Sequence, residues 1–114
     1  MAGITTHVLD TARGKPAARV PVTLEVSDAA GAWSLVGRGA TDEDGRLRDL
    51  TSQHEMRAAS YRITFDTEAY FAALGVESHF YPRVSIEFAV RAPSEHFHVP
   101  LLISPFGYST YRGS

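Results

Sequence analysis

The chain has 114 residues, a formal net charge of -2 with histidine neutral, 44% hydrophobic and 21% charged residues, and no cysteine. This length suits one domain with a single core, and the composition is that of an ordinary globular protein. The mildly acidic charge gives no basic surface for nucleic acid or an anionic membrane, and the lack of cysteine excludes disulfides, a catalytic thiolate and Cys-ligated zinc.

The first half of the chain is predicted to form short strands separated by turns, since apolar residues alternate with polar ones between clusters of glycine, proline and aspartate. The expected strands span residues 4–10, 20–27 and 33–40. In the first of them, alternation places Thr5 and His7 on one face and the apolar Ile4 and Val8 on the other. An acidic turn then leads directly to Arg46.

The second half alternates in the same way, with one interruption that favours a helix. The expected strands span residues 61–65, 83–90, 96–104 and 107–113. Between the first two, Asp66 or Thr67 can cap a short helix that Gly75 ends. Residues 51–60 have no clear period, which is typical of a loop with one short edge strand. Seven or eight strands and one short helix indicate an all-β fold, a β-sandwich.

The sequence shows neither a membrane segment nor a targeting signal. No apolar run approaches the roughly 20 residues needed to span a bilayer. Residues 1–7 have neither the basic nor the apolar region of a signal peptide. The ending Arg112-Gly113-Ser114 is not of the S-K-L type that directs proteins to peroxisomes. We therefore expect a cytoplasmic protein with one domain over residues 1–114 and no membrane or nucleic-acid partner.

Three of the five histidines form a candidate site. His96 and His98 are separated by one residue, so on a strand both imidazoles lie on one face. Such a pair can hold zinc when a third ligand arrives from elsewhere, and His7 is the obvious candidate. The competing interpretation is a set of ordinary strand histidines, because bare H-x-H pairs arise by chance and the chain has no H-E-x-x-H motif or cysteine ligand. We expect no metal and no cofactor.

Two further features are ambiguous when read alone. Arg46 follows an acidic turn and would by default form a surface ion pair worth at most about 1 kcal/mol. That turn does not match a calcium loop, because Ala40 and Thr51 occupy the positions of acidic ligands. The last four residues, 111–114, combine an aromatic ring, a guanidinium, a glycine and a hydroxyl directly after an apolar strand. This pattern indicates an ordered chain end that can serve as part of a site.

Four sequence blocks match a known family along essentially the whole chain. They are residues 4–11 with 14–17; the turn 41–46 with its D-G-R; residues 70–71 with 75–78 and 81–82; and residues 96–114, which contain H-x-H, L-L-I-S-P, Y-S-T and Y-R-G-S. On these blocks the chain resembles the transthyretin-like proteins, and among them the 5-hydroxyisourate hydrolases of urate breakdown. Residues 53–57 match no pattern of the family.

The last block is the most specific. Thyroid-hormone-carrying transthyretins are similar in the L-L-S-P and Y-S-T portions but lack the terminal Y-R-G-S, and they have other residue types at the positions of His7, Arg46 and His98. The resemblance therefore favours the hydrolases. The alternative is a non-catalytic carrier that binds an aromatic small molecule in a channel between dimers. A third hypothesis, a metal-dependent hydrolase using His7, His96 and His98, predicts loss of activity after chelation.

The resemblance implies a transthyretin-like sandwich of two four-stranded sheets with one short helix, assembled as a homotetramer, a dimer of dimers. It implies metal-independent hydrolysis of the six-membered ring of 5-hydroxyisourate, giving 2-oxo-4-hydroxy-4-carboxy-5-ureidoimidazoline, in urate degradation towards allantoin. The implied catalytic residues are His7, Arg46 and His98. The implied substrate-binding residues are Tyr111, Gly113 and Ser114. Either histidine can be the general base, Ser114 is expected to bind rather than attack, and the D-G-R register favours Arg46 over the nearby Arg48.

Overall fold

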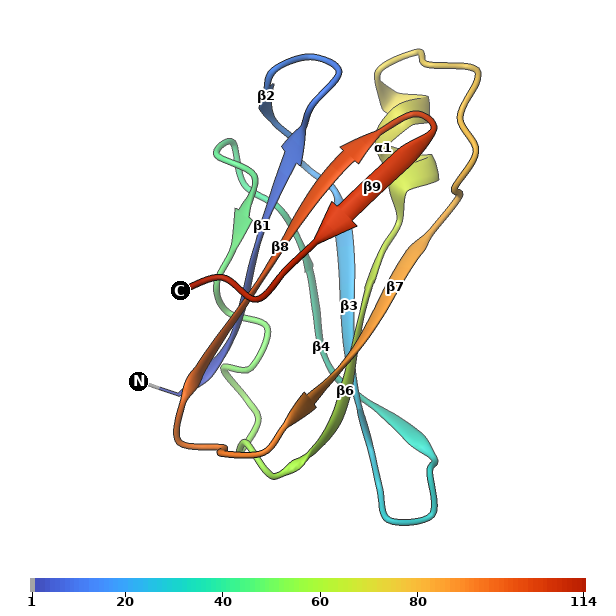
Figure 1. Ribbon diagram of the computed structural model, residues 1–114. Helices are drawn as coiled ribbons and strands as arrows, with labels where there is room; N and C mark the ends of the chain where they lie inside the picture. The colour runs from blue at the N-terminus through green and yellow to red at the C-terminus, as the bar shows by residue number, and fades with distance from the viewer. Residues whose placement is uncertain (1) are drawn as a thin grey trace.

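Two β-sheets pack face to face, and one short helix lies at one end of the sandwich (Figure 1). The computed structural model describes residues 2–114. The first sheet contains β1 (Gly3–Asp10), β2 (Lys15–Pro16), β5 (Arg46–Leu47), β8 (His96–Ser104) and β9 (Gly107–Thr110). The second contains β3 (Pro21–Ser27), β4 (Trp33–Ala40), β6 (Ala59–Phe65) and β7 (Val84–Val90), and helix α1 (Thr67–Ala73) follows β6. The predicted all-β sandwich with one short helix is confirmed.

The first sheet has five strands, where four were expected. Its order is β2-β1-β8-β9, and β5 also pairs with β1. The two-residue strands β2 and β5 share one edge of β1, since β2 pairs with Leu9 and Asp10 whereas β5 pairs with Thr6 and His7. The second sheet has the expected four strands in the order β4-β3-β6-β7. The additional strand carries Arg46, one of the predicted site residues.

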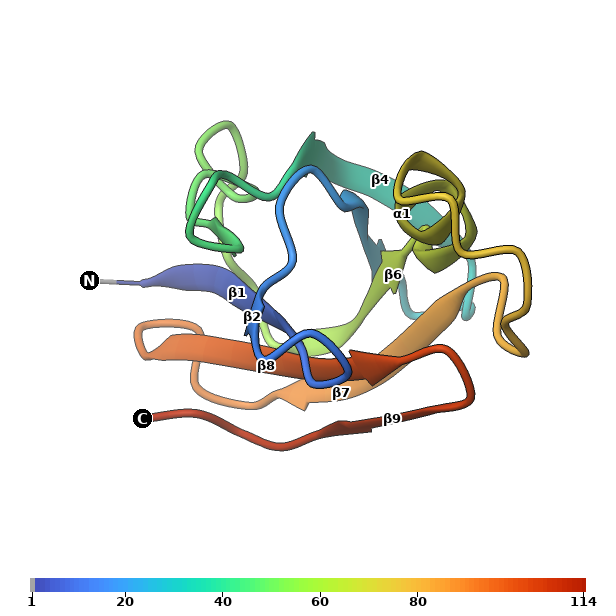
Figure 2. The same ribbon diagram turned by 90° about the horizontal axis from the view of Figure 1, so that it is seen from above.

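Strands β1 and β8 lie side by side and parallel along their whole lengths. In this register Thr5 is the partner of His98, and His7 that of Pro100. After β9 the chain continues along the other edge of β8, where Gly113 forms an isolated antiparallel bridge with His98. In the view from above, β8 and β9 form one side of the molecule and β4 the opposite side (Figure 2). His98 is thus flanked by β1 and by the C-terminal residues.

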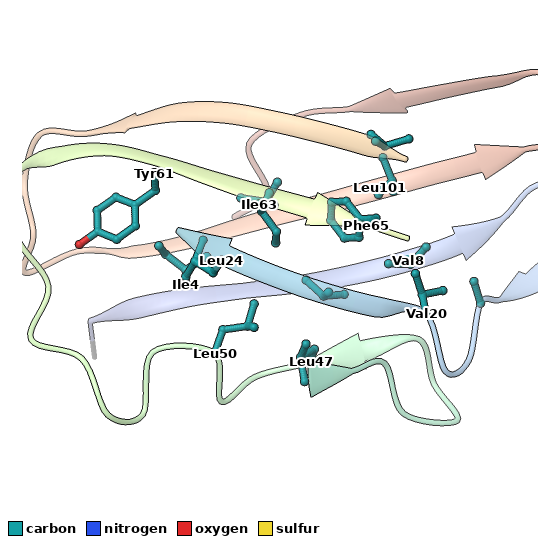
Figure 3. Packing of buried hydrophobic residues seen from close by; sticks show 14 of the residues in the cluster. Ile4, Val8, Val20, Leu24, Leu47, Leu50, Tyr61, Ile63, Phe65 and Leu101 are labelled. Carbon is teal, nitrogen blue, oxygen red and sulfur yellow. The ribbon is translucent and has the colours of Figure 1, made fainter. Parts of the chain in front are cut away.

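The core consists of the inward-facing residues of both sheets (Figure 3). Ile4 and Val8 of β1 and Leu101 of β8 are completely buried against Leu24 of β3 and Phe65 of β6. Burying one such side chain stabilises the folded chain by roughly 1.5–3 kcal/mol relative to leaving it in water. The alternation that produces this core turns the intervening polar residues of β1 and β8 outward.

Helix α1 has the predicted limits and is tied to β1 by a buried hydrogen bond. The Asp66 side chain accepts a hydrogen bond of 3.0 Å from the backbone N–H of Ala69, and Gly75 follows the helix in the left-handed region. On the buried side, the hydroxyl of Tyr70 donates to Oδ2 of Asp10 at 2.7 Å. None of the helices within residues 2–114 is long and apolar enough to cross a membrane.

Two predicted boundaries were wrong. Residues 51–58 contain no strand, and the segment expected to form a loop with a short edge strand joins β6 only at Ala59. The last strand, predicted to reach residue 113, ends at Thr110. Beyond it, the backbone N–H of Gly113 donates to the carbonyl of His98 at 2.9 Å. The terminal residues are therefore held against β8, as the sequence indicated.

Candidate active site

The outward face of the first sheet gathers three of the five histidines. Thr5 and His7 of β1 are half-buried between fully buried neighbours, because side chains alternate along the strand. His96 and His98 project to the same side from β8, which confirms the expected common face of the H-x-H pair. The parallel register then brings Thr5 directly beside both imidazoles.

One hydroxyl group joins the two imidazoles of β8. Oγ1 of Thr5 lies 2.9 Å from Nε2 of His96 and 2.8 Å from Nδ1 of His98. On the other side of His98, the ring carbon Cδ2 faces the backbone of Gly113. Because Nδ1 and Cδ2 are both engaged, the distal edge of the His98 ring, with Nε2, is the part left for a ligand.

Arg46 is placed by the acidic turn that precedes it. Oδ1 of Asp42 accepts hydrogen bonds of 2.9 Å from the backbone N–H groups of Asp44 and Arg46. The hydrogen bond from the Arg46 N–H is the main reason why the pKa of Asp42 is lowered. Gly45 completes the turn in the left-handed region, at a point where a side chain would collide with the carbonyl of Val8. The turn directs Arg46 into β5, opposite His7.

The structure also determines which nitrogen of His7 carries a proton. Nε2 of His7 lies 2.9 Å from the carbonyl oxygen of Asp44. A carbonyl oxygen only accepts, so Nε2 must donate. When His7 is neutral, its lone pair therefore sits on Nδ1.

A cavity of about 330 Å³ opens on this face of the sheet. It is lined by Thr5, Thr6, Arg46, Arg48, His96, His98 and Ser114. Of the predicted catalytic residues, His98 and Arg46 line the cavity, and His7 lies next to Arg46 on the adjacent strand without lining it. Of the predicted substrate-binding residues, Ser114 lines it and Gly113 contacts His98 from the side.

Tyr111 lies outside this cavity. It lines a neighbouring, mostly apolar cavity of about 240 Å³ together with Ile86, Phe88 and one side of His98. Within one chain, Tyr111 and Arg46 are therefore on different sides of the imidazole. Tyr111 is 60% exposed.

Arg112 holds the terminal residues in place. Its guanidinium donates to Oε1 of Glu95 at 3.1 Å and to the carbonyl of His96 at 3.4 Å, and it lies 4.7 Å from the centre of the Phe97 ring. These contacts fasten residue 112 to the beginning of β8. Gly113 and Ser114 are thereby kept beside the cavity.

The imidazole of His98 is biased towards its neutral form. Partial burial lowers its pKa, and the positive charges of His96, Arg46 and His7 lower it further. A histidine with a lowered pKa is unprotonated at neutral pH and can accept a proton from water. The site thus combines a neutral imidazole with the permanent cations Arg46 and Arg48, an arrangement suited to an anionic substrate.

The sequence did not indicate a role in the site for Thr5, and Arg48 was considered only as an alternative to Arg46. Thr5 was placed on the face of His7 by alternation, but no pattern in the sequence indicated its contacts with His96 and His98. Arg48 lines the same cavity as Arg46 because only Leu47 separates them, and alternate side chains of an extended segment share a face. Within residues 2–114, no group of three or more His, Asp or Glu side chains is arranged to hold a metal ion.

Comparison with known proteins gives a consistent match along the chain. A family model described as the HIUase/Transthyretin family matches residues 4–113. The 5-hydroxyisourate hydrolase of Salmonella typhimurium is 41% identical over 111 residues, which cover 97% of this chain and 80% of that protein.

Two solved structures, one of a transthyretin and one of a 5-hydroxyisourate hydrolase, have nearly the same backbone as this chain. The transthyretin of Sparus aurata superposes with a TM-score of 0.91 at 29% identity, covering 99% of this chain and 97% of that one. The 5-hydroxyisourate hydrolase of Klebsiella pneumoniae superposes with a TM-score of 0.85 at 36% identity, and the match covers 100% of both chains. The choice between the two activities therefore depends on the side chains of the site.

Proposed function

Since this chain belongs to the HIUase/Transthyretin family, we propose that it is a hydrolase that opens the six-membered ring of 5-hydroxyisourate, a step of urate degradation. The observation that carries this proposal is the cavity in which His98, Arg46 and Ser114 meet. These residues come from β8, from the short strand β5 and from the C-terminal segment. A neutral imidazole beside two guanidinium groups suits water activation on an anionic ring better than the uptake of an apolar ligand.

The cations of the cavity account for substrate binding. The planar substrate carries carbonyl and N–H groups along its edge and readily becomes an anion. The forked, permanently charged guanidinium of Arg46 would hold this anionic edge and stabilise the charge that develops on the attacked carbonyl oxygen. The hydroxyl of Ser114 and the backbone near Gly113 would bind polar groups of the ring, so Ser114 is a binding group and not a nucleophile.

His98 is our candidate for the general base. His98 lines the cavity, its pKa is lowered, and Nε2 is the ring nitrogen that does not contact Thr5. In the proposed reaction Nε2 takes a proton from water while the water oxygen bonds to the ring carbonyl carbon. The C–N bond of the ring then breaks, and the protonated imidazole returns its proton to the leaving nitrogen. His7, opposite Arg46 with its lone pair on Nδ1, would orient the water or the arginine.

A homotetramer and a cytoplasmic location are further parts of the proposal. Exposed aromatic side chains lie in and after the loop that joins β8 to β9: Phe106 is 66% exposed, Tyr108 44% and Tyr111 60%. Apolar rings exposed to this extent beside a site favour burial by another chain. Light scattering after size exclusion measures the mass of the assembly, and cell fractionation measures the location.

The decisive experiment is an ultraviolet decay assay on 5-hydroxyisourate generated in the cuvette from urate. Catalysis predicts that the substrate signal decays faster with the protein than by spontaneous hydrolysis, in proportion to protein concentration. Binding of an aromatic ligand without any acceleration of the decay would support the carrier instead. Loss of the acceleration after chelation would support the metal-dependent alternative.

A further inference from the structure

The hydroxyl of Thr5 lies between two nitrogen atoms that compete for one hydrogen. It is within hydrogen-bond distance of Nε2 of His96 and Nδ1 of His98. A hydroxyl group donates one hydrogen bond and accepts through two lone pairs. At most one of the two imidazoles can therefore accept from Thr5, and the other must donate to it. The proton positions on the two rings are coupled through this side chain.

Three arrangements satisfy both contacts when the histidines are neutral. In the first, Nδ1–H of His98 donates to Thr5, and Thr5 donates to Nε2 of His96, so Nε2 of His98 carries a lone pair. In the second, both hydrogen bonds run the other way, and Nε2 of His98 carries a hydrogen. In the third, both rings donate to the lone pairs of Thr5, and Nε2 of His98 again carries a lone pair, but the hydroxyl hydrogen joins neither ring. The second arrangement alone prevents His98 from accepting a proton from water.

The charges around the cavity disfavour the second arrangement, and the first differs from the third in using the hydroxyl hydrogen of Thr5 for a hydrogen bond to His96. His98 faces the cations Arg46 and Arg48 across the cavity, and His7 lies on the neighbouring strand. A lone pair on Nε2 points the negative end of the imidazole dipole towards these guanidinium groups, whereas an N–H would point its positive end at them. His96 is exposed, so water can hydrogen-bond its other nitrogen in either tautomer.

We propose that Thr5 is a positioning residue that keeps the Nδ1 proton on His98 by donating its own hydrogen to His96, and so presents Nε2 of His98 as the base. Its catalytic part depends on the proposed hydrolase function, whereas the tautomer of His98 does not. Thr5 itself need not touch the substrate. The role requires its hydroxyl group and not its methyl group.

Two substitutions separate these groups. Thr5→Val keeps the size and branching of the side chain and removes the hydroxyl, whereas Thr5→Ser keeps the hydroxyl. We expect Thr5→Val to lower kcat at least tenfold with little change in KM, on the scale of an impaired proton transfer. Thr5→Ser should stay within about threefold of the parent protein. Equal losses in both variants, or none in Thr5→Val, would overturn the catalytic role.

The tautomer is measured separately by nitrogen-15 NMR of the imidazoles near neutral pH. The parent protein and Thr5→Ser should show His98 protonated on Nδ1, and Thr5→Val should lose this preference. A parent His98 protonated on Nε2 would refute the proposal, even in an active enzyme. A parent protein that holds the Nδ1 proton but does not hydrolyse 5-hydroxyisourate would instead refute the proposed function.

The matched control is Thr64→Val in β6 of the other sheet. The hydroxyl of Thr64 lies 3.1 Å from Oγ of Ser85. Both residues belong to the second sheet, whereas the site lies on the first. The same chemical change there should leave both kcat and the His98 spectrum unaltered. A parallel loss of kcat in Thr64→Val would mean that hydroxyl removal acts through the stability of the sandwich.

Discussion

Gly113 packs so closely against the imidazole of His98 that any side chain at position 113 would force one of the two to move. A β-carbon at position 113 would lie 2.5 Å from Cδ2 of His98, well inside van der Waals contact. The backbone N–H of Gly113 also donates to the carbonyl of His98 at 2.9 Å. Glycine is needed here for close approach, since its backbone does not lie in the left-handed region. The C-terminal segment therefore helps to set the orientation of the His98 ring.

Gly113→Ala should displace either the His98 ring or the terminal residues. We expect kcat/KM to fall at least tenfold while the melting temperature changes little, because the terminal segment contributes little to the core. Steady-state kinetics with the ultraviolet assay and a thermal melt check this. Gly107→Ala is the matched control, since an added β-carbon there has its nearest neighbour at 3.7 Å. If the Gly113→Ala variant retains full activity, the close packing of Gly113 against His98 has no catalytic role.

His98→Asn removes the proposed base from a folded protein. We expect turnover to fall at least about a hundredfold, the usual scale for a lost acid–base group. The assembly, measured by light scattering, should be unchanged because His98 is outside the core cluster. Activity close to that of the parent protein would exclude His98 as the base and favour His7.

The pKa of His98 should respond to its charged neighbours. Burial and the charges of His96, Arg46 and His7 hold it below the ordinary value of 6.5. Replacing Arg46 by glutamine removes one of these charges, so the pKa should rise but remain below 6.5. NMR titration of the ring protons measures this directly. An unchanged or lower pKa of His98 in the variant would contradict the proximity of Arg46 and His98.

The lowered pKa of His98 in the folded state also affects stability. The unfolded chain binds the proton more readily than the folded chain, so His98 makes the fold less stable as the pH falls below 6.5.

The turn before Arg46 should depend on one carboxylate. Asp42→Ala leaves the N–H groups of Asp44 and Arg46 without their acceptor, so Arg46 should be poorly positioned. We expect activity to fall severalfold through a higher KM, because the guanidinium is proposed to bind the substrate. Asp42→Asn, which keeps a side-chain oxygen, should recover part of this loss. Since the pKa of Asp42 is lowered, the carboxylate keeps its role until the pH falls below the ordinary range of aspartate.

Tyr70→Phe tests stability without touching the site. It removes the hydrogen bond from the tyrosine hydroxyl to the buried Asp10, which should cost about 1–3 kcal/mol of unfolding free energy and leave kcat unchanged. Burial and the bond to Asp10 raise the pKa of Tyr70 to about 12. The parent protein should therefore lose stability from about pH 10 upwards, where the unfolded tyrosine ionises first. Urea titrations at pH 7 and pH 11 measure both effects. If Tyr70→Phe loses as much unfolding free energy between pH 7 and pH 11 as the parent protein, another group is responsible for the alkaline loss of stability.

Much of the fold follows from local patterns. Alternation in β1 and β8 places apolar residues inward and Thr5, His7 and His98 outward, because consecutive side chains of a strand point to opposite faces. The limits of helix α1 follow from Asp66, which caps its first turn, and from Gly75 after its end. Patterns of this kind are local, so the sequence predicts them with the right boundaries.

Other features depend on contacts between distant parts of the chain. The last strand ends at Thr110 and β5 pairs with β1 because of the strands that lie beside them. The alternation of apolar and polar residues in the sequence does not show which strands are neighbours. Alternation gave no placement for Tyr111 and Ser114, which line different cavities, because the strand ends at Thr110 and both residues lie beyond it.

The amino-acid sequence by itself determined the family, the alternating faces and the candidate site residues, because each of these depends on residue type and short-range order. Only the tertiary structure decided that Thr5 joins two imidazoles and that the lone pair of His7 lies on Nδ1. It also decided that Gly113 packs against His98. These relations come from the register of β1 on β8 and from the return of the terminal residues along β8, and a strand register is set by the packing of the whole sheet.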